Sequence, residues 1–281
     1  MVWTSLFDQV TTIARTAPMS IGIGVGPQYV DRTVRAAKRA AAEGLAKITL
    51  VGDEASMSIE RAEGVKVRIV KSPKPWETML DLLDEGGIDG VVRGSFASSF
   101  ALVAKQRYGT MERIALLETV NHYPFFLAPV GVEEGETPPE KFLIVKGGCQ
   151  LVEALGFSPK VSVLSGGRTE NKGPIIEKSR SDALQLVQMA RRAGIPAIHH
   201  EILIEDAIGD ANIILAPDGI SGNLIYRTLV HLGGGRSHGA PYLNQGGRII
   251  VDTSRVGPVE EYVSAIALAS ALAGIKKGKG R

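Results

Sequence analysis

A serine and an arginine stand side by side late in the chain, where a predicted strand gives way to a predicted helix. Residues 248–252 are apolar enough for a buried strand, and Ser254 and Arg255 follow it closely. A guanidinium offers its donors in a planar fork that matches phosphate oxygens. A hydroxyl beside it can donate to the same anion. The pair therefore indicates a site for a phosphate-like group at this junction.

The start of the following helix supports this interpretation. Pro258 suits the first position of a helix because its ring fixes the backbone dihedral there, and the helix is predicted over residues 258–273. Unpaired N–H groups and the helix dipole favour an anion at such an end. Glu260 and Glu261 lie in the first turn, close in sequence to the serine and the arginine.

A second junction of the same kind lies upstream. The predicted strand 212–215 ends just before Pro217, and a helix is predicted over residues 222–231. The carboxyl ends of parallel strands, followed by helix starts, are where open α/β sheets bind ligands. The candidate ligand-binding residues here are Asp218, Ser221, Gly222 and Asn223.

Two more strand ends contribute candidates. Residues 161–164 are predicted as a strand that leads into Ser165, Gly166, Gly167 and Arg168. Glycines let backbone N–H groups approach a phosphate, so this loop is a candidate cradle. A plain turn explains the same residues equally well.

Arg93 and Ser95 form the last candidate pair. They follow a predicted strand at residues 90–92, which places a cation and a hydroxyl at its carboxyl end. We therefore include both among the predicted substrate-binding residues.

A glycine run offers an alternative site. Residues 22–26, with the sequence GIGVG, open a strand-to-helix turn, and Asp53 ends the next strand. Such a turn can hold a nucleotide or S-adenosylmethionine. However, the third glycine of the dinucleotide fingerprint falls at Pro27. The acidic residue expected before the glycines of a methyltransferase is replaced by Ser20.

Short β-branched runs alternate with amphipathic segments along the chain, a pattern typical of a mostly parallel sheet covered by helices. Further strands are predicted over residues 20–25, 47–51 and 65–70. Further helices are predicted over residues 29–44, 77–83 and 181–193. The sequence therefore predicts an α/β fold.

A change of pattern near the middle predicts a second lobe. Residues 125–132 and 141–145 look like two strands joined by a turn at residues 135–139, which would form a β-hairpin. We expect two α/β lobes with a cleft between them. The predicted boundaries are 1–130 plus 246–281 for lobe I and 131–245 for lobe II.

Composition narrows the function classes. The chain has 281 residues, a net charge of +2 and no basic stretch interleaved with aromatic residues, so we expect no nucleic-acid partner. It has no long apolar run and no signal-peptide pattern, and its single cysteine, Cys149, precludes an intrachain disulfide. We expect a cytoplasmic protein without a membrane partner. The histidines have no zinc-ligand spacing, so no metal site is predicted.

Three separated segments resemble the phosphate acetyltransferases and phosphate butyryltransferases. They are ANIILAPDGISGNLIYR at residues 211–227, DTSR followed by VEEYV at 252–263, and GFSPKV followed by VLS at 156–165. A weaker similarity covers residues 31–47 and DGVVRG at 89–94. Within this superfamily the SGGR loop is similar to a branch from methanogenic archaea, methanogenesis marker protein 4, also called methyltransferase subunit MtxX.

The resemblance implies a two-lobed, three-layer αβα fold of the isocitrate/isopropylmalate dehydrogenase-like type, usually a homodimer. It implies transfer of an acyl group between phosphate and coenzyme A, with no tightly bound cofactor and coenzyme A as co-substrate. The substrates would be an acyl phosphate, phosphate or a coenzyme A thioester. Ser254 would stabilise the tetrahedral transition state, Arg255 would hold the phosphoryl group and Glu261 would accept the thiol proton.

The chain also departs from the superfamily. Val256 replaces a glycine, Glu261 replaces an aspartate, and the place of a second arginine falls near Lys105. Arg93 or Arg168 would have to supply that charge. Two alternatives therefore stay open: a component of a methyl-transfer system with partner subunits, or a non-catalytic ligand-binding subunit.

Overall fold

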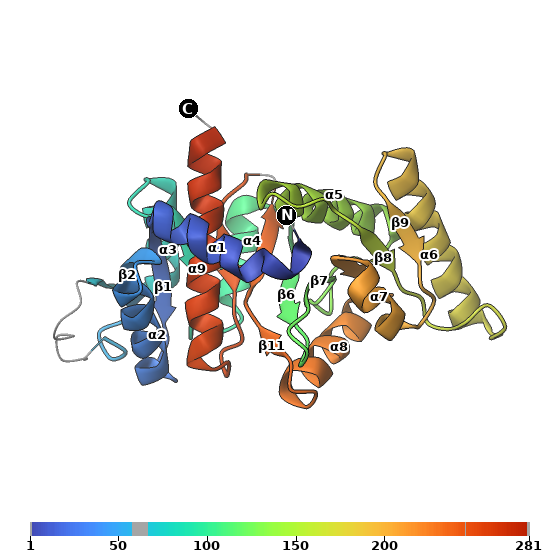
Figure 1. Cartoon of the computed structure of the whole chain (residues 1–281). Helices are drawn as coiled ribbons and strands as arrows, with labels where there is room; N and C mark the ends of the chain where they lie inside the picture. Colours follow the sequence, from blue (N-terminus) through green and yellow to red (C-terminus); the bar gives the residue numbers. More distant parts are fainter. Residues whose placement is uncertain (1, 58–66, 245, 280–281) are drawn as a thin grey trace. The chain divides into compact units, whose positions relative to one another are not determined.

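The computed structural model describes residues 2–57, 67–244 and 246–279 (Figure 1). The chain forms two compact units. Unit 1 comprises Met1–Leu6 and Glu112–Ser237, and unit 2 comprises Phe7–Met111 and His238–Arg281. The chain thus passes between the units earlier than the predicted crossings at residues 130 and 245. The cleft between the two lobes stays a prediction.

The extreme N-terminal segment joins unit 1 through one tryptophan. Trp3, in the short 3₁₀ helix Trp3–Ser5, donates its indole N–H to the carbonyl of Pro124 at 2.6 Å. Its ring also packs edge-on against Phe157, with 5.2 Å between the ring centroids. This attachment was not predicted, because its partners lie more than a hundred residues away in the chain.

Unit 2 is built around a mostly parallel sheet in the order β3-β2-β1-β4-β13-β12-β5, in which β12 runs antiparallel to its neighbour β13. The strands are β1 (Met19–Val25), β2 (Ala46–Gly52), β3 (Arg68–Lys71), β4 (Gly90–Val92), β5 (Met111–Arg113), β12 (Ala240–Asn244) and β13 (Ile250–Asp252). The helices are α1 (Leu6–Thr16), α2 (Val30–Ala42), α3 (Pro75–Asp84), α4 (Phe100–Tyr108) and α9 (Val259–Lys279). Because β1, β4 and β13 are parallel neighbours, their carboxyl ends meet at one edge of the sheet.

Helix α9 anchors this unit. Tyr262, Ile266 and Ala269 are buried, and the helix packs against α2 and the central strands (Figure 1). Alanines at positions 36, 37 and 40 of α2 are also fully buried. Small side chains on both helices allow this close packing. The packing fixes the positions of the two helix starts at the edge of the sheet.

Unit 1 contains a second sheet in the order β11-β6-β7-β10-β8-β9. The strands are β6 (Ala115–Glu118), β7 (Pro124–Ala128), β8 (Val161–Val163), β9 (Ala197–His199), β10 (Ile213–Leu215) and β11 (Arg236–Ser237). The helices are α5 (Pro138–Ala154), α6 (Pro174–Arg192), α7 (Ile204–Asp210) and α8 (Gly219–His231). Strands β7, β10, β8 and β9 are parallel, so their carboxyl ends also share an edge.

The predicted hairpin is wrong in position. Residues 141–145 belong to α5, which begins at a capping box formed by Thr137 and Glu140. The apolar run in this segment continues with helical spacing, so Ile144, Gly148 and Val152 are all buried. The hairpin of this unit is instead β6–β7, with Leu116 opposite Phe126.

Most other predicted elements are confirmed, with ends shifted by a few residues. The exception is the predicted strand at residues 65–70, whose first two residues lie outside the described part; β3 covers residues 68–70 of it. Within the described residues, no helix is long and apolar enough to cross a bilayer.

Candidate functional site

The loop that carries Ser254 and Arg255 is held at three points by other parts of unit 2. The backbone N–H of Ser254 donates to Glu261 Oε1 at 2.7 Å. The Tyr262 hydroxyl donates to the carbonyl of Arg255 at 3.0 Å, and Arg32 donates to the carbonyl of Gly257 at 2.7 Å. The backbone between β13 and α9 is therefore fixed from one side by the first turn of α9 and from another by α2.

The functional groups of this loop are left unengaged. Ser254 is half-buried and Arg255 is exposed. Neither the serine hydroxyl nor the arginine guanidinium makes a hydrogen bond or ion pair with any residue that the structure describes. A rigid loop thus presents a hydroxyl and a cation, side by side, at the carboxyl edge of the sheet.

Glu261 lies beneath the loop. Its side chain is buried, and a Cβ atom at Gly257 would come within 2.1 Å of Glu261 Oε2. The absence of a side chain at Gly257 is what leaves room for the carboxylate. With Oε1 engaged by the Ser254 amide, this geometry favours a positioning role over the proton-accepting role that the resemblance implies.

Arg93 and Ser95 lie at the same edge but are occupied. The Arg93 guanidinium donates to Asp252 Oδ1, to the carbonyl of Thr253 and, at 2.7 Å, to the carbonyl of Phe96. The Ser95 hydroxyl accepts from the N–H of Gly26 at 3.0 Å and pairs with the Thr33 hydroxyl at 2.9 Å.

These contacts tie the loops after β1, β4 and β13 together. Both side chains are more than nine-tenths buried. We therefore do not assign Arg93 as the second cation of an anion site. Arg93 and Ser95 both hold these loops together.

The glycine run at residues 22–26 also serves packing. A Cβ at Gly24 would lie 2.4 Å from the carbonyl oxygen of Arg93, and a Cβ at Gly26 would lie 2.4 Å from that of Ser95. The backbone of β1 therefore approaches the loop after β4 directly. This close approach accounts for the glycines without a nucleotide or S-adenosylmethionine.

Tyr29 and Arg32 are neighbours of the site that the sequence did not predict. Tyr29 has a left-handed backbone (φ 60°) just before α2, a conformation that costs a non-glycine residue on the order of 1 kcal/mol. The Arg32 guanidinium lies 4.8 Å from the centre of the Tyr29 ring. No sequence signal marks this pair, because its link to the site is the contact between Arg32 and the distant Gly257.

The candidates of unit 1 around α8 form a helix cap and a packing contact. Asp218 caps α8 by accepting from the N–H of Ser221 at 2.7 Å. Gly222 permits the close approach of α8, since a Cβ there would lie 1.8 Å from the carbonyl oxygen of Pro129. Asn223 donates to the carbonyl of Val130 at 2.9 Å. These residues fix α8 against the loop that follows β7.

The loop from Ser165 to Arg168 is a closed turn. The N–H of Gly166 donates to the Ser179 hydroxyl at 2.9 Å, and the N–H of Arg168 donates to Asn171 Oδ1 at 2.7 Å. A Cβ at Gly167 would come within 2.8 Å of Ile176, so this glycine allows α6 to approach. Two of the amides expected to cradle phosphate are thus satisfied internally, although the Arg168 side chain is exposed.

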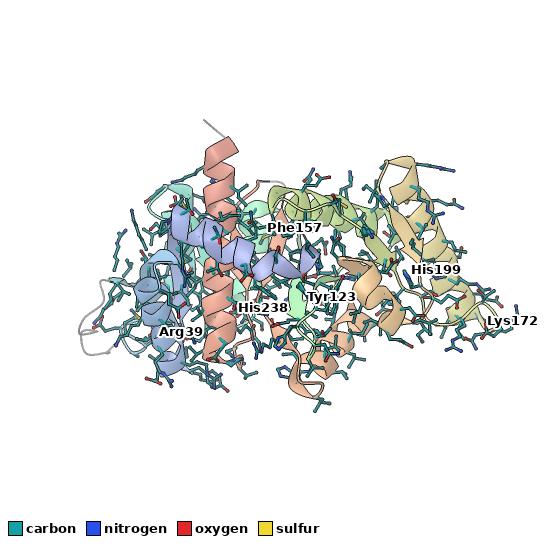
Figure 2. The ribbon with its side chains drawn as sticks, viewed as in Figure 1. Arg39, Tyr123, Phe157, Lys172, His199 and His238 are labelled. Atoms are coloured by element: carbon teal, nitrogen blue, oxygen red, sulfur yellow. The ribbon has the colours of Figure 1, made fainter. Side chains whose placement is uncertain are left out.

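Ser165 itself is buried within that turn. Its hydroxyl donates to the carbonyl of Gly167 at 3.1 Å and lies 2.9 Å from Nε2 of His199, whose position at the end of β9 is shown in Figure 2. Burial lowers the pKa of His199. Because the Ser165 hydroxyl donates its hydrogen to the Gly167 carbonyl, it accepts the hydrogen bond from His199. His199 is therefore not placed to take a proton from Ser165, and the serine is not arranged as an activated nucleophile.

A buried lysine at this edge was missed. Lys141, in the first turn of α5, is only 5% exposed and donates from Nζ to the carbonyl of Pro217, next to the α8 cap. Burial lowers its pKa, and the nearby carboxylates of Asp182 and Asp218 oppose that shift. The spacing of Thr137 and Glu140 matches a capping box, although residues 135–139 were interpreted as a turn and residues 141–145 as a strand, and nothing in the sequence indicated that the amine is buried.

This lowered pKa predicts a pH-dependent stability. Between the folded-state pKa of Lys141 and its ordinary value of 10.5, the unfolded chain holds a proton that the folded chain has lost, so stability rises with pH. Lys141→Met removes this contribution. The difference in free energy of unfolding between wild type and Lys141→Met should therefore shift in favour of wild type as the pH approaches 10.5. Urea denaturation at a series of pH values measures it.

The matched control is Lys146→Met, which replaces an exposed lysine of the same helix. Its stability should run parallel to that of wild type across the pH series. If the Lys141→Met curve is also parallel, the ammonium is solvated and the interpretation of Lys141 fails.

Metal chemistry has no candidate ligands in the residues described. No group of three or more histidine, cysteine, aspartate or glutamate side chains there is arranged to hold an ion.

Sequence comparison places close relatives among methanogenic archaea. A protein of Methanosarcina acetivorans named "putative methyltransferase mtx subunit X" is 38% identical over 278 residues, which cover 97% of each chain. A phosphate butyryltransferase of Clostridium acetobutylicum is 28% identical over 90% of this chain and 94% of its own length. No protein-family model matches the chain.

Solved structures share the fold. A branched-chain phosphotransacylase from Enterococcus faecalis superposes with a TM-score of 0.73 at 17% identity, covering 91% of this chain and 99% of that one. A phosphotransacetylase from Streptococcus pyogenes gives a TM-score of 0.71 at 18% identity, covering 98% of this chain and 100% of that one. The predicted phosphotransacetylase-like α/β fold is confirmed.

Proposed function

Because the chain belongs to the mtx subunit X family and has a phosphotransacetylase-like fold, we propose that it transfers an acyl group between phosphate and coenzyme A. One observation carries the proposal. The loop after β13 has its backbone held at three points, yet its hydroxyl and guanidinium, on Ser254 and Arg255, are left without partners among the described residues. Such a pair is suited to a bound phosphoryl group.

The chemistry assigned to these side chains is simple. The thiolate of coenzyme A attacks the carbonyl carbon of an acyl phosphate, a C–S bond forms, and the C–O bond to phosphate breaks with the electron pair leaving on phosphate. Arg255 binds the phosphoryl oxygens through its planar fork. Ser254 donates its hydroxyl to the oxygen that gains negative charge in the tetrahedral transition state.

Glu261 supports this arrangement indirectly. Its Oε1 accepts from the Ser254 amide, and its Oε2 lies against Gly257, where a Cβ atom would come within 2.1 Å. We therefore assign Glu261 the role of a positioning residue, which holds the serine in place while Arg255 binds the anion.

The test is an acyl-transfer assay with purified protein. Acetyl-, butyryl- and branched-chain acyl-coenzyme A are incubated with and without phosphate, and free thiol is followed colorimetrically. We expect thiol release that requires both protein and phosphate. The proposal is abandoned if no acyl chain length gives phosphate-dependent release.

A second candidate function is a role in methyl transfer, which the name of the 38% identical relative supports. Thermal stabilisation by S-adenosylmethionine, with none by coenzyme A or acyl phosphate, would favour it. Co-purification with partner subunits, and no shift by any of these small molecules, would instead favour a non-catalytic ligand-binding subunit.

A further inference from the structure

The outer faces of α2 and the first turn of α9 form a groove in unit 2. Its volume is about 530 Å³, and its lining residues are Arg35, Lys38, Arg39, Ala42, Val259 and Glu260. Figure 2 labels Arg39 on α2. All lining residues belong to these two helices, which pack against each other. None belongs to the Ser254–Arg255 pair, so the groove is a separate feature of the same unit.

Three cations and one carboxylate line the groove, and two further carboxylates, Asp31 and Glu43, pair with Arg35 and Arg39. Lys38 has no hydrogen bond or ion pair with any described residue. Arg35 has only a 3.7 Å contact with Asp31, whose side chain is 85% exposed, and such a pair contributes little. Two of the three cations are thus available to an anion.

The third cation is held in place. Arg39 donates from Nε to Glu43 at 2.7 Å and from Nη1 to Glu260 at 3.3 Å, and these carboxylates raise its pKa. One guanidinium nitrogen, Nη2, is not used in these two bonds. A guanidinium fixed in this way loses little side-chain entropy when it binds an anion, because its position is already set.

The size and floor of the groove indicate more than a simple ion. The groove is open to solvent along the two helices, so it has room for more than a single phosphate ion. Ala42 and Val259 supply an apolar surface between the cations. Guanidinium groups, moreover, stack on flat rings as well as bind phosphate. The combination matches a ligand with phosphate at one end and an aromatic ring at the other.

We propose that the groove between α2 and α9 binds a nucleotide, with its phosphates on Arg35 and Lys38 and its base over Ala42 and Val259. The proposal does not depend on acyl transfer, since it involves none of the residues assigned to that reaction. It gives the unit two anion sites, one on each side of the first turn of α9.

Isothermal titration calorimetry with ADP, pyrophosphate and adenosine at fixed ionic strength tests the proposal. ADP should bind wild type more tightly than pyrophosphate, which lacks the base, and than adenosine, which lacks the phosphates. Lys38→Glu and Arg35→Glu should each weaken ADP binding by about tenfold or more, because each reverses one charge beside the phosphates. Melting temperatures of the variants establish that they are folded.

Two control variants keep the result decisive. Lys146→Glu makes the same charge change on an exposed helical position of unit 1 and should leave ADP affinity unchanged. Arg255→Ala should also leave it unchanged. The proposal is overturned if Lys38→Glu binds ADP like wild type, if ADP binds no more tightly than either fragment, or if Arg255→Ala alone removes binding. Loss of acyl transfer in any of these variants has no bearing on this outcome.

Discussion

Arg255→Ala should lower phosphate-dependent thiol release from acyl-coenzyme A by at least about 100-fold, while the melting temperature stays close to that of wild type. The large kinetic effect is expected because the guanidinium would be the one cation offered to the phosphoryl group by a fixed loop. The small stability effect is expected because this guanidinium makes no hydrogen bond or ion pair with a described residue, whereas the loop is held through backbone atoms and Glu261. Steady-state kinetics with varied phosphate, and thermal denaturation, measure the two effects.

Two further variants sharpen this experiment. Arg255→Lys keeps the charge but loses the fork, so it should recover only part of the activity, chiefly through a higher KM for phosphate. Arg192→Ala, at an exposed arginine in the last turn of α6, is the matched control and should change neither quantity. A marked fall in melting temperature for Arg255→Ala would mean that Arg255 is structural, and full activity would remove it from the site.

The positions of the candidate loops could be predicted from the sequence because strand and helix patterns determine them. β13 and α9 were predicted within a few residues, and parallel strands necessarily bring their carboxyl ends to one edge. The pairing of β4 with both β1 and β13 then places three predicted junctions together. Local patterning was therefore sufficient to identify where the candidate residues lie.

The state of each side chain could not be predicted in this way. Arg93 and Arg255 both follow a strand, yet the first is buried against Asp252 and the second is exposed. The difference arises from a partner 159 residues away, which no local pattern encodes. The glycines at positions 24 and 26 show the same limit, because their closeness to Arg93 and Ser95 depends on how β1 and β4 pair.

The misplaced hairpin has a different cause. Short apolar runs are ambiguous between a strand and a buried helix, and residues 141–145 are such a run. The deciding signal was upstream, in Thr137 and Glu140, whose spacing is that of a capping box. Because this run was interpreted as a strand, the burial of Lys141 within it was not predicted.

Arg93→Met should destabilise unit 2 by about 3–5 kcal/mol, the range found when one partner of a buried ion pair is removed. The side chains of Arg93 and Asp252 are 9% and 10% exposed, so the remaining carboxylate would stay in a dry environment. Tyr242 and the N–H of Thr253 would still donate to it, at 3.2 and 2.8 Å, and these bonds retain part of its stabilisation.

The measurement can be confined to the affected unit. The chain has two tryptophans, and in a Trp3→Phe background Trp76 alone reports urea unfolding by its fluorescence. Trp76 packs against Phe96, with 6.4 Å between the ring centroids, and the carbonyl of Phe96 accepts from Arg93. The reporter therefore lies in the region that the substitution disturbs.

The matched control is Lys71→Met, which breaks a 2.6 Å ion pair with Glu54 whose side chains are 41% and 80% exposed. Lys71→Met should lower the free energy of unfolding by no more than about 1 kcal/mol, because exposed ion pairs contribute little to stability. Adding Asp252→Asn to Arg93→Met should recover part of the lost stability, because it removes the buried charge that Arg93 faces in the wild type. If Arg93→Met costs no more than Lys71→Met, the buried pair does not hold the loops together. In that case the hydrogen bond from Arg93 to the carbonyl of Thr253 adds little to the stability of the loop. The contacts of Glu261, Tyr262 and Arg32 then account for the rigid presentation of Ser254 and Arg255.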